Sequence, residues 1–347
     1  MHPRKRILVT RFSALGDVAL TIPVLSCMVE QFPNVELVLV SQGFAEPLVR
    51  NISGITLFKA DLKGKHRGFW GLWKLSKELK KMGKWYGFAD LHDVLRTKLL
   101  RIFLIFAIPK QAVINKGRKE KRALTRRKNK KIHQLTHSVN RYNGVFNALG
   151  FKVNVEFNSL TDRFDSQSAS IAKLLGEKND TWIGFAPFAK HKGKAYPLEL
   201  SKQVIENLSN EPNIRIMLFG GGKEEVNTLN ELERLFPNTI SLAGKLSLDD
   251  ELIVMSKLDV MLSMDSANMH LASLVGTRVV SIWGATHPNA GFYGWNQLSD
   301  DAIQINDLGC RPCSVFGNKP CFRKDYACLY QIEPKEIVSK IKKIIDI

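Results

Sequence analysis

The sequence has no long uninterrupted hydrophobic run. Its most apolar stretch, residues 99–108, contains Arg101 and is about half the ~20 residues that a membrane-spanning helix needs, so we interpret it as a buried helix. A basic N-terminal flank precedes an apolar stretch, but that stretch breaks at Arg11 and Asp17 before any small-residue cleavage site. We therefore expect neither a secretory signal nor a membrane span.

Acidic residues are outnumbered by basic ones. The chain has 33 Asp and Glu against 51 Lys and Arg, which gives a formal net charge of +18. This imbalance favours anionic partners such as phosphates, acidic sugars or lipid headgroups. The charge is concentrated in residues 116–131, hereafter the basic segment, where ten Lys or Arg stand against Glu120 alone. A local electrostatic function is one interpretation of this segment, and a solvated, disordered loop is the other.

Cysteine is scarce as well, with five in the chain, and Cys27 lies in an apolar stretch typical of a helix core. The other four cluster near the C-terminus, beginning with a Cys-x-x-Cys spacing: Cys310, Cys313, Cys321 and Cys328. Such spacing can hold a structural zinc ion, whereas free thiols are the alternative. A reducing cytoplasm would disfavour stable disulfides.

What is present suits a globular protein of two domains. The chain has 347 residues, of which 44% are hydrophobic and 24% charged, and this composition excludes global disorder and fibrous classes. We expect a first domain at residues 1–160, a linker at 161–180, and a second domain with a cysteine-containing tail at 181–347.

Apolar strand-like runs alternate with helical patterns along both halves. In the first half the runs are residues 7–12, 35–40, 55–60, 88–91 and 112–114, and in the second half they are 182–187, 214–219, 239–242, 259–264 and 278–283. Nearly continuous apolar runs between helices indicate parallel strands covered on both faces. The sequence thus predicts an α/β protein with two doubly wound, Rossmann-like domains whose carboxyl strand edges face a central cleft.

The turn after the first predicted strand places Gly16 and Asp17 where a helix begins. One interpretation directs the Asp17 carboxylate toward a ligand, and the other makes Asp17 a helix N-cap. Pro23 fits either a kink or the first turn of a renewed helix.

A second motif, residues 265–270, follows the fourth strand of the second half. Ser266 is a predicted N-cap, and free backbone N–H groups at such a helix start bind anions such as a diphosphate. Asp265 and His270 flank this opening, which favours a functional over a structural role for the histidine. The full set at this motif is Asp265, Ser266, Ala267, Asn268, Met269 and His270.

Two further loops also follow predicted strands. Residues 188–197 contain three lysines within five positions, including Lys194, and a solvated loop is the alternative interpretation. Residues 219–225 contain three consecutive glycines, which allow close approach of the backbone to a ligand, and Glu224 or Glu225 could accept hydrogen bonds from ribose or sugar hydroxyls. The glycine spacing matches neither a dinucleotide fingerprint nor a Walker loop.

Taken together, residues 11–23 and 259–288 resemble glycosyltransferase family 9, the lipopolysaccharide heptosyltransferases, and the resemblance extends over essentially the whole chain. The resemblance implies the GT-B fold, with the acceptor bound mainly by the N-terminal domain and the nucleotide-sugar donor mainly by the C-terminal domain. It also implies an inverting reaction with no obligatory metal or cofactor, and ADP-heptose as the donor.

The same resemblance implies roles for individual residues. Asp17 would be the general base that takes the acceptor hydroxyl proton, and Lys194 would stabilise the departing diphosphate. Glu224 would hold the nucleotide ribose, and Leu246 would pack near the base. We also assign Ser13 and Gly16, together with the 265–270 motif, to donor binding.

Members of this family act at the inner face of the cytoplasmic membrane on an acceptor built from lipid A and acidic Kdo sugars. We therefore expect a cytoplasmic, membrane-peripheral protein whose acceptor or membrane contacts include Lys116, Arg118, Lys119, Arg126 and Arg127. The alternative functions are a non-catalytic anionic glycolipid-binding protein or a nucleic-acid-binding protein. No nucleic-acid-binding module is apparent in the sequence, so a nucleic-acid partner is not expected.

Overall fold

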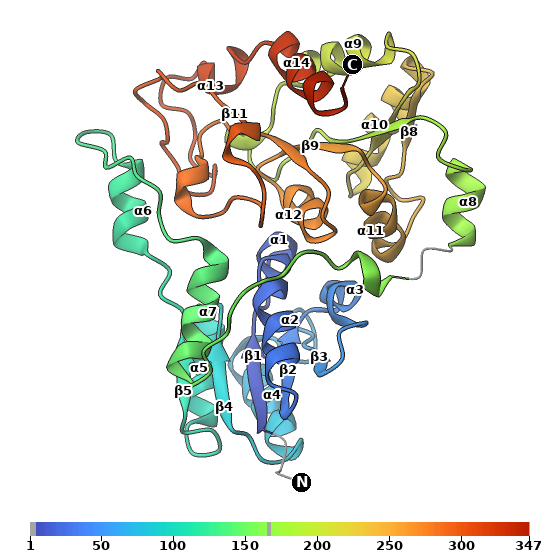
Figure 1. The fold of residues 1–347 in the computed structure, drawn as a ribbon. Helices are drawn as coiled ribbons and strands as arrows, with labels where there is room; N and C mark the ends of the chain where they lie inside the picture. Colours follow the sequence, from blue (N-terminus) through green and yellow to red (C-terminus); the bar gives the residue numbers. More distant parts are fainter. Residues whose placement is uncertain (1–4, 165–167, 347) are drawn as a thin grey trace. The chain divides into compact units, whose positions relative to one another are not determined.

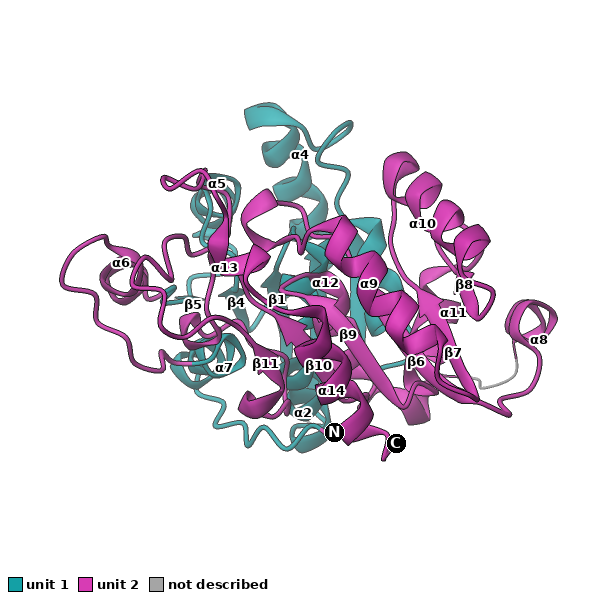
Figure 2. Cartoon of the chain, turned by 90° about the horizontal axis from the view of Figure 1, so that it is seen from above, with its two compact units in different colours: residues 1–116, 137–157 teal, residues 117–136, 158–347 magenta. Residues whose placement is uncertain are grey.

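The computed structural model describes residues 5–164 and 168–346. It contains two compact units, one of Met1–Lys116 with His137–Phe157 and one of Gly117–Thr136 with Asn158–Ile347 (Figure 2). Residues 1–4 of the basic N-terminal flank and residues 165–167 of the expected linker lie outside the described residues. No helix within the described ranges is long and apolar enough to cross a membrane.

The first unit is built on a five-stranded parallel sheet with strand order β3-β2-β1-β4-β5 (Figure 1). The strands are β1 (Lys5–Thr10), β2 (Val35–Ser41), β3 (Ile55–Lys59), β4 (Gly87–Asp90) and β5 (Gln111–Val113). The helices are α1 (Leu15–Ala19), α2 (Ile22–Gln31), α3 (Glu46–Val49), α4 (Gly68–Lys81), α5 (Leu95–Leu104) and α7 (Ser138–Ala148).

Both faces of this sheet are covered, which explains why its central strands are nearly all apolar. On one face, Leu8 and Phe88 pack against leucines of α4 and α5, including Leu75 and Leu100. On the other, α2 packs against β2 and α7 packs against β4 and β5. The expected helix after β1 is two helices, and Pro23 lies in the first turn of α2, where its missing N–H is not needed.

The second unit is built on a six-stranded parallel sheet with strand order β11-β10-β9-β6-β7-β8. Its strands are β6 (Thr181–Ala186), β7 (Ile214–Leu218), β8 (Thr239–Ser241), β9 (Val260–Met264), β10 (Val279–Ile282) and β11 (Ala302–Ile303). Its helices are α6 (Arg118–Thr125), α8 (Ala169–Leu175), α9 (Leu198–Ser209), α10 (Lys223–Leu235), α11 (Leu248–Ser256), α12 (Ala267–Leu274), α13 (Ala327–Tyr330) and α14 (Pro334–Ile344).

Successive side chains along each strand of the second sheet point to opposite faces of the sheet. Ile183, Ile216 and Leu262 belong to one core cluster with side chains of α9, α10 and α14. On β9 and β10 the sheet also packs against α12, with α11 beside α12. The predicted α/β class with two parallel sheets is therefore confirmed.

The basic segment has a defined place in the fold. Apart from Lys116, it groups with the second unit, although the predicted boundaries put residues 116–131 within the first domain. It contains a helix, α6, which differs from one of its two interpretations, the disordered loop. The reason is apolar anchoring: Leu124 and Leu135 are buried against Ala290, and the Lys121 ammonium lies 3.9 Å from the centre of the Phe292 ring.

Gly184, in the middle of β6, provides a test of packing in the second unit. A Cβ at this position would overlap the side chains of Leu258 and Met261, so we expect Gly184→Ala to destabilise the protein by about 1–3 kcal/mol. The matched control is Gly221→Ala, because a Cβ at this exposed position has no atom within 4 Å. Thermal unfolding should show a lower Tm for Gly184→Ala alone, and equal Tm values for the two variants would contradict this packing.

Candidate functional site

The turn after β1 is held by a buried arginine. The Arg11 guanidinium forms an ion pair with Asp17 at 2.7 Å, and its Nη1 donates a hydrogen bond to the Leu91 carbonyl at 2.9 Å. The guanidinium also lies 5.9 Å from the centre of the buried Tyr142 ring. Burial raises the pKa of Tyr142 to about 12, so this phenol stays neutral beside the charged pair.

Asp17 is the third residue of α1, and Ala14 occupies the N-cap position. Asp17 is therefore not the helix N-cap, which was one interpretation of the sequence, but its Oδ2 accepts a hydrogen bond from the Ala14 N–H at 3.2 Å and so stabilises the helix start from the third position. Its side chain nevertheless stays 36% exposed, which leaves the carboxylate accessible to a ligand. Ser13 and Gly16 lie in the same turn.

The loop after β4 lies next to this turn because β4 is paired with β1. His92 Nδ1 accepts a hydrogen bond from the Phe12 N–H at 3.2 Å, so the imidazole fixes the start of the turn. Burial, reinforced by the positive charges of Arg11 and Lys116, lowers the pKa of His92 to about 3. The histidine is therefore a neutral structural acceptor at physiological pH.

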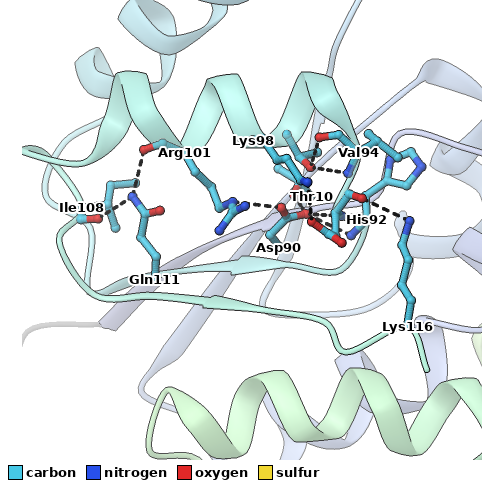
Figure 3. A network of polar contacts seen from close by, with 11 residues as sticks. Thr10, Asp90, His92, Val94, Lys98, Arg101, Ile108, Gln111 and Lys116 are labelled. Atoms are coloured by element: carbon cyan, nitrogen blue, oxygen red, sulfur yellow. Dashed lines mark hydrogen bonds and ion pairs between the residues drawn. The ribbon is translucent and has the colours of Figure 1, made fainter. Parts of the chain in front are cut away.

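A fully buried carboxylate, Asp90, organises the loop that carries His92 (Figure 3). Its Oδ1 accepts hydrogen bonds from the backbone N–H groups of His92 and Asp93 at 3.0 and 2.9 Å, and from the Thr10 hydroxyl at 3.2 Å. Its Oδ2 lies 3.2 Å from Arg101 Nε. Asp90 thus joins the ends of β1 and β4.

In the second unit, an ion pair joins the loops that follow β6 and β9. Lys194 ends a short 3₁₀ turn after β6, and its ammonium lies 3.0 Å from Asp265, the residue after β9. The two side chains are only 17% and 6% exposed. Ser266 occupies the N-cap position of α12, as predicted, although its side chain makes no capping hydrogen bond.

The loop with Lys194 is held by close backbone approach. The Ala285 N–H donates to the Gly193 carbonyl at 2.8 Å. A Cβ on Gly284 would lie 2.6 Å from that carbonyl oxygen, and one on Gly193 would lie 2.9 Å from the Gly317 carbonyl oxygen. Only glycine permits such close packing, so the tail around Gly317 lies directly against the loop that carries Lys194 and supports it.

The other donor-site candidates lie on the same edge of the second sheet. Glu224 is exposed in the first turn of α10, after β7, and Leu246 is partly buried before α11, after β8. His270 is buried within α12, after β9. Because β9, β6, β7 and β8 are consecutive neighbours and parallel, the structure brings these candidates to one sheet edge.

Four side chains that the sequence did not single out have defined roles here, since Arg11, Asp90, His92 and Tyr142 surround the Asp17 turn. Glu225, the alternative to Glu224 in the sequence, accepts a hydrogen bond from the Gly221 N–H through its Oε2 at 2.9 Å. Asp90 and His92 lie at the end of a predicted strand, so the rule that ligands bind at carboxyl strand ends could have found them. Tyr142 gives no such signal, because it is one of many apolar positions on a helix.

The four clustered cysteines line one small pocket, together with Lys319, Phe322 and Asp325 among others. They are free thiols, and burial raises the pKa of Cys328 to about 12. Within the described part of the chain, no group of three or more His, Cys, Asp or Glu is arranged so that it could hold a metal ion, and the structure therefore does not support the structural zinc site.

The basic segment is fastened to this cysteine-containing tail. The Lys130 ammonium donates to the carbonyls of Gly309 and Arg311 at 3.0 and 3.1 Å, and the Arg127 guanidinium lies 4.6 Å from the centre of the Phe322 ring. Several of its predicted contact residues are exposed, namely Arg118, Lys119, Arg126 and Arg127. Lys116 instead donates to the Asp93 carbonyl in the first unit, at 3.2 Å.

Comparison with known proteins gives three informative matches. A model of Glycosyltransferase family 9 (heptosyltransferase) matches residues 75–320. The lipooligosaccharide heptosyltransferase 2 of Campylobacter jejuni is 23% identical over 336 residues, which are 95% of this chain and 96% of that protein. The structure of E. coli ADP-heptose LPS heptosyltransferase II aligns with a TM-score of 0.71 and 16% identity, covering 98% of each chain.

A further structure, E. coli heptosyltransferase WaaC with ADP, aligns with a TM-score of 0.70 and 18% identity, covering 98% of this chain and 99% of that one. The structural similarities confirm the GT-B-like fold with two parallel sheets. The family model begins at residue 75, so it includes the loops of Lys194 and Asp265 but not the turn of Asp17.

The low pKa of His92 predicts a pH dependence of stability. A folded-state pKa of about 3 against an ordinary value of 6.5 means that the unfolded chain binds a proton between these values that the folded chain does not. The free energy of unfolding should therefore fall, as pH drops from 6.5 toward 3, by up to about 1.4 kcal/mol per pH unit from this residue.

The matched variant is His92→Asn, whose amide oxygen can accept the Phe12 hydrogen bond without titrating. Urea unfolding at pH 7, 6, 5 and 4 should show a shallower loss of stability for the variant than for the wild type. Parallel pH curves would show that His92 takes up a proton as readily in the folded protein as in the unfolded chain, which would contradict the lowered pKa.

Proposed function

Because the chain belongs to glycosyltransferase family 9, the heptosyltransferase family, we propose that it transfers a heptose or related sugar from an ADP-sugar to the inner core of a lipopolysaccharide, with inversion at the anomeric carbon. The observation that carries this proposal is the Lys194–Asp265 ion pair beside the start of α12. This arrangement provides an ammonium group and backbone N–H donors within one short stretch of sheet edge.

The donor is assigned to the second unit. A diphosphate would accept hydrogen bonds from the first N–H groups of α12 and would compete with Asp265 for the Lys194 ammonium. Glu224 and Leu246, which follow the neighbouring strands, would contact the ribose and the base. The two E. coli structures, a heptosyltransferase named for ADP-heptose and one with ADP, support an adenine nucleotide here.

The proposed reaction is a direct displacement. The acceptor hydroxyl oxygen forms a bond to the anomeric carbon as the bond from that carbon to the diphosphate oxygen breaks, and the hydroxyl proton passes to the Asp17 carboxylate. Negative charge develops on the departing ADP, where Lys194 and the start of α12 would stabilise it. The proposal assigns this charge stabilisation to the protein and calls for no metal ion.

Arg11 would hold the Asp17 carboxylate in the orientation needed to accept the hydroxyl proton. The ion pair and the Ala14 hydrogen bond hold the carboxylate in one orientation, while its exposed part remains available to the acceptor. A base that is already oriented loses little entropy when the acceptor binds. Ser13 and Gly16, in the same turn, remain proposed donor contacts.

We assign the acceptor and the location of the protein from the positive charge of the basic segment. Exposed cations of the basic segment, including Arg118, Lys119, Arg126 and Arg127, would attract an acceptor that carries lipid A phosphates and acidic Kdo sugars. We propose that the protein works in the cytoplasm, at the inner face of the cytoplasmic membrane. The lipooligosaccharide named for the Campylobacter relative supports this acceptor class.

The donor assignment can be tested by thermal unfolding in the presence of nucleotides. ADP and ADP-sugars should raise the Tm more than the matching UDP and GDP compounds, because only a ligand that binds the folded state stabilises it. Lys194→Met should weaken ADP binding about 10–100-fold, the usual effect of removing a charged hydrogen-bond partner.

Lys202→Met on α9 is the matched control, since this lysine pairs with Glu231 away from the α12 opening. Equal Tm shifts with ADP, UDP and GDP would reject adenine as the base of the donor. Wild-type ADP affinity in Lys194→Met would reject the contact between Lys194 and the diphosphate.

The base assignment predicts that Asp17→Asn lowers kcat by about 10²–10⁴-fold while ADP affinity stays unchanged. The amide oxygen can still accept the Ala14 hydrogen bond, so the turn should persist. The control is Glu46→Gln. It neutralises an acidic residue of α3 that pairs with Lys59, and it should leave kcat unchanged. Sugar transfer to an isolated core acceptor is the readout, and normal turnover in Asp17→Asn would exclude this residue as the base.

A further inference from the structure

Large apolar side chains gather on the outer side of α4 and α5. Seven of the thirteen large hydrophobic residues that are exposed in the described structure belong to these helices or to the two residues after α5. Single exposed apolar residues are ordinary, but a concentration of this kind marks an interaction site. The seven, hereafter the α4–α5 face, are Phe69, Trp70, Trp73, Leu95, Ile102, Ile105 and Phe106.

The aromatic rings of the two helices contact one another. Phe69 packs edge-to-face with Trp70 at 5.3 Å and with Phe103 of α5 at 5.2 Å, and Trp70 packs against Trp73 at 6.1 Å between ring centres. The aromatic surface is therefore shared by both helices. Trp70 is 74% exposed and Phe106 is 97% exposed.

Folding of the first unit does not require these side chains. Helix α4 buries Leu72, Leu75 and Leu79 against the sheet, whereas Trp70 and Trp73 occupy other positions of the same helix. Helical spacing places Trp70, Trp73 and Lys77 along one stripe, at positions i, i+3 and i+7. A sequence that needed only a covered sheet would carry polar residues on this stripe.

The charge around the α4–α5 face is almost wholly positive. Helix α4 carries four lysines against Glu78, whose carboxylate already pairs with Lys65 at 2.8 Å. Helix α5 carries two arginines and a lysine and no acidic residue. The Lys77 ammonium lies 3.5 Å from the centre of the Trp73 ring, an arrangement that covers an aromatic ring and still presents charge.

We propose that the α4–α5 face binds the surface of an anionic lipid bilayer. Tryptophan and phenylalanine would enter the boundary between headgroups and acyl chains, and the surrounding lysines and arginines would contact lipid phosphates. A second copy of the chain would bring two cationic surfaces together, so it does not suit this face. The surface is separate from the basic segment, and the proposal does not depend on the transfer reaction.

The test is sedimentation of the full chain with vesicles of phosphatidylethanolamine and phosphatidylglycerol at 7:3, compared with pure phosphatidylcholine vesicles. We expect Trp70→Ala/Phe106→Ala to lower the partition coefficient on the anionic vesicles at least tenfold. Lys74→Glu/Lys77→Glu should have a similar effect. Because all four side chains are exposed, the Tm should not change.

Two controls separate this face from other surfaces. Leu235→Ala/Tyr330→Ala removes apolar side chains that are 53% and 51% exposed in the second unit, and should bind vesicles like the wild type. Arg126→Gln/Arg127→Gln neutralises the basic segment and should retain most of the binding.

Wild-type partitioning of Trp70→Ala/Phe106→Ala would overturn the proposal, as would complete loss of binding in Arg126→Gln/Arg127→Gln. Sedimentation velocity without lipid provides the last outcome. If the wild type self-associates and Trp70→Ala/Phe106→Ala does not, with equal vesicle binding by both, the face is a protein interface and the lipid assignment is wrong.

Discussion

Both units depend on one topological constraint. In each parallel sheet the chain leaves two neighbouring strands toward opposite faces, between β1 and β4 in the first unit and between β6 and β9 in the second. The loops after such strands diverge, and the space between them admits a ligand. In this protein each of these places is bridged by polar groups: Phe12 and His92 in the first unit, and Lys194 and Asp265 in the second.

The two bridges differ in their electrostatics. The first unit uses two buried groups, the neutral His92 imidazole and the Asp90 carboxylate, to fix the backbone around a partly exposed Asp17. The second leaves a cation and an anion paired beside a helix start, where in the proposed reaction the diphosphate would replace the carboxylate. In that proposal the first unit would supply the proton acceptor, Asp17, and the second unit the cation that pairs with the diphosphate.

The sequence predicts the strands and helices of both units well because continuous apolar runs and helical periodicity alternate with few interruptions. It also predicts that the candidate residues after β6, β7, β8 and β9 lie along one edge of the second sheet, because the carboxyl ends of parallel strands meet there. It does not predict where the basic segment belongs, because Leu124 stands among the ten basic residues of the segment and Leu135 lies beyond its end. Nor does it show that Cys313 and Cys328 are buried deeply enough for burial to raise the pKa of their thiols.

The close packing of glycines next to Lys194 makes the C-terminal tail a support for the position of this lysine. The backbone N–H groups of Cys313 and Ser314 donate to the Ala285 carbonyl, while the Ala285 N–H holds Gly193. The tail is thus a buttress for the lysine. An insertion or deletion in the tail would therefore be expected to displace the Lys194 ammonium group, because Gly317 lies directly against the Lys194 side chain.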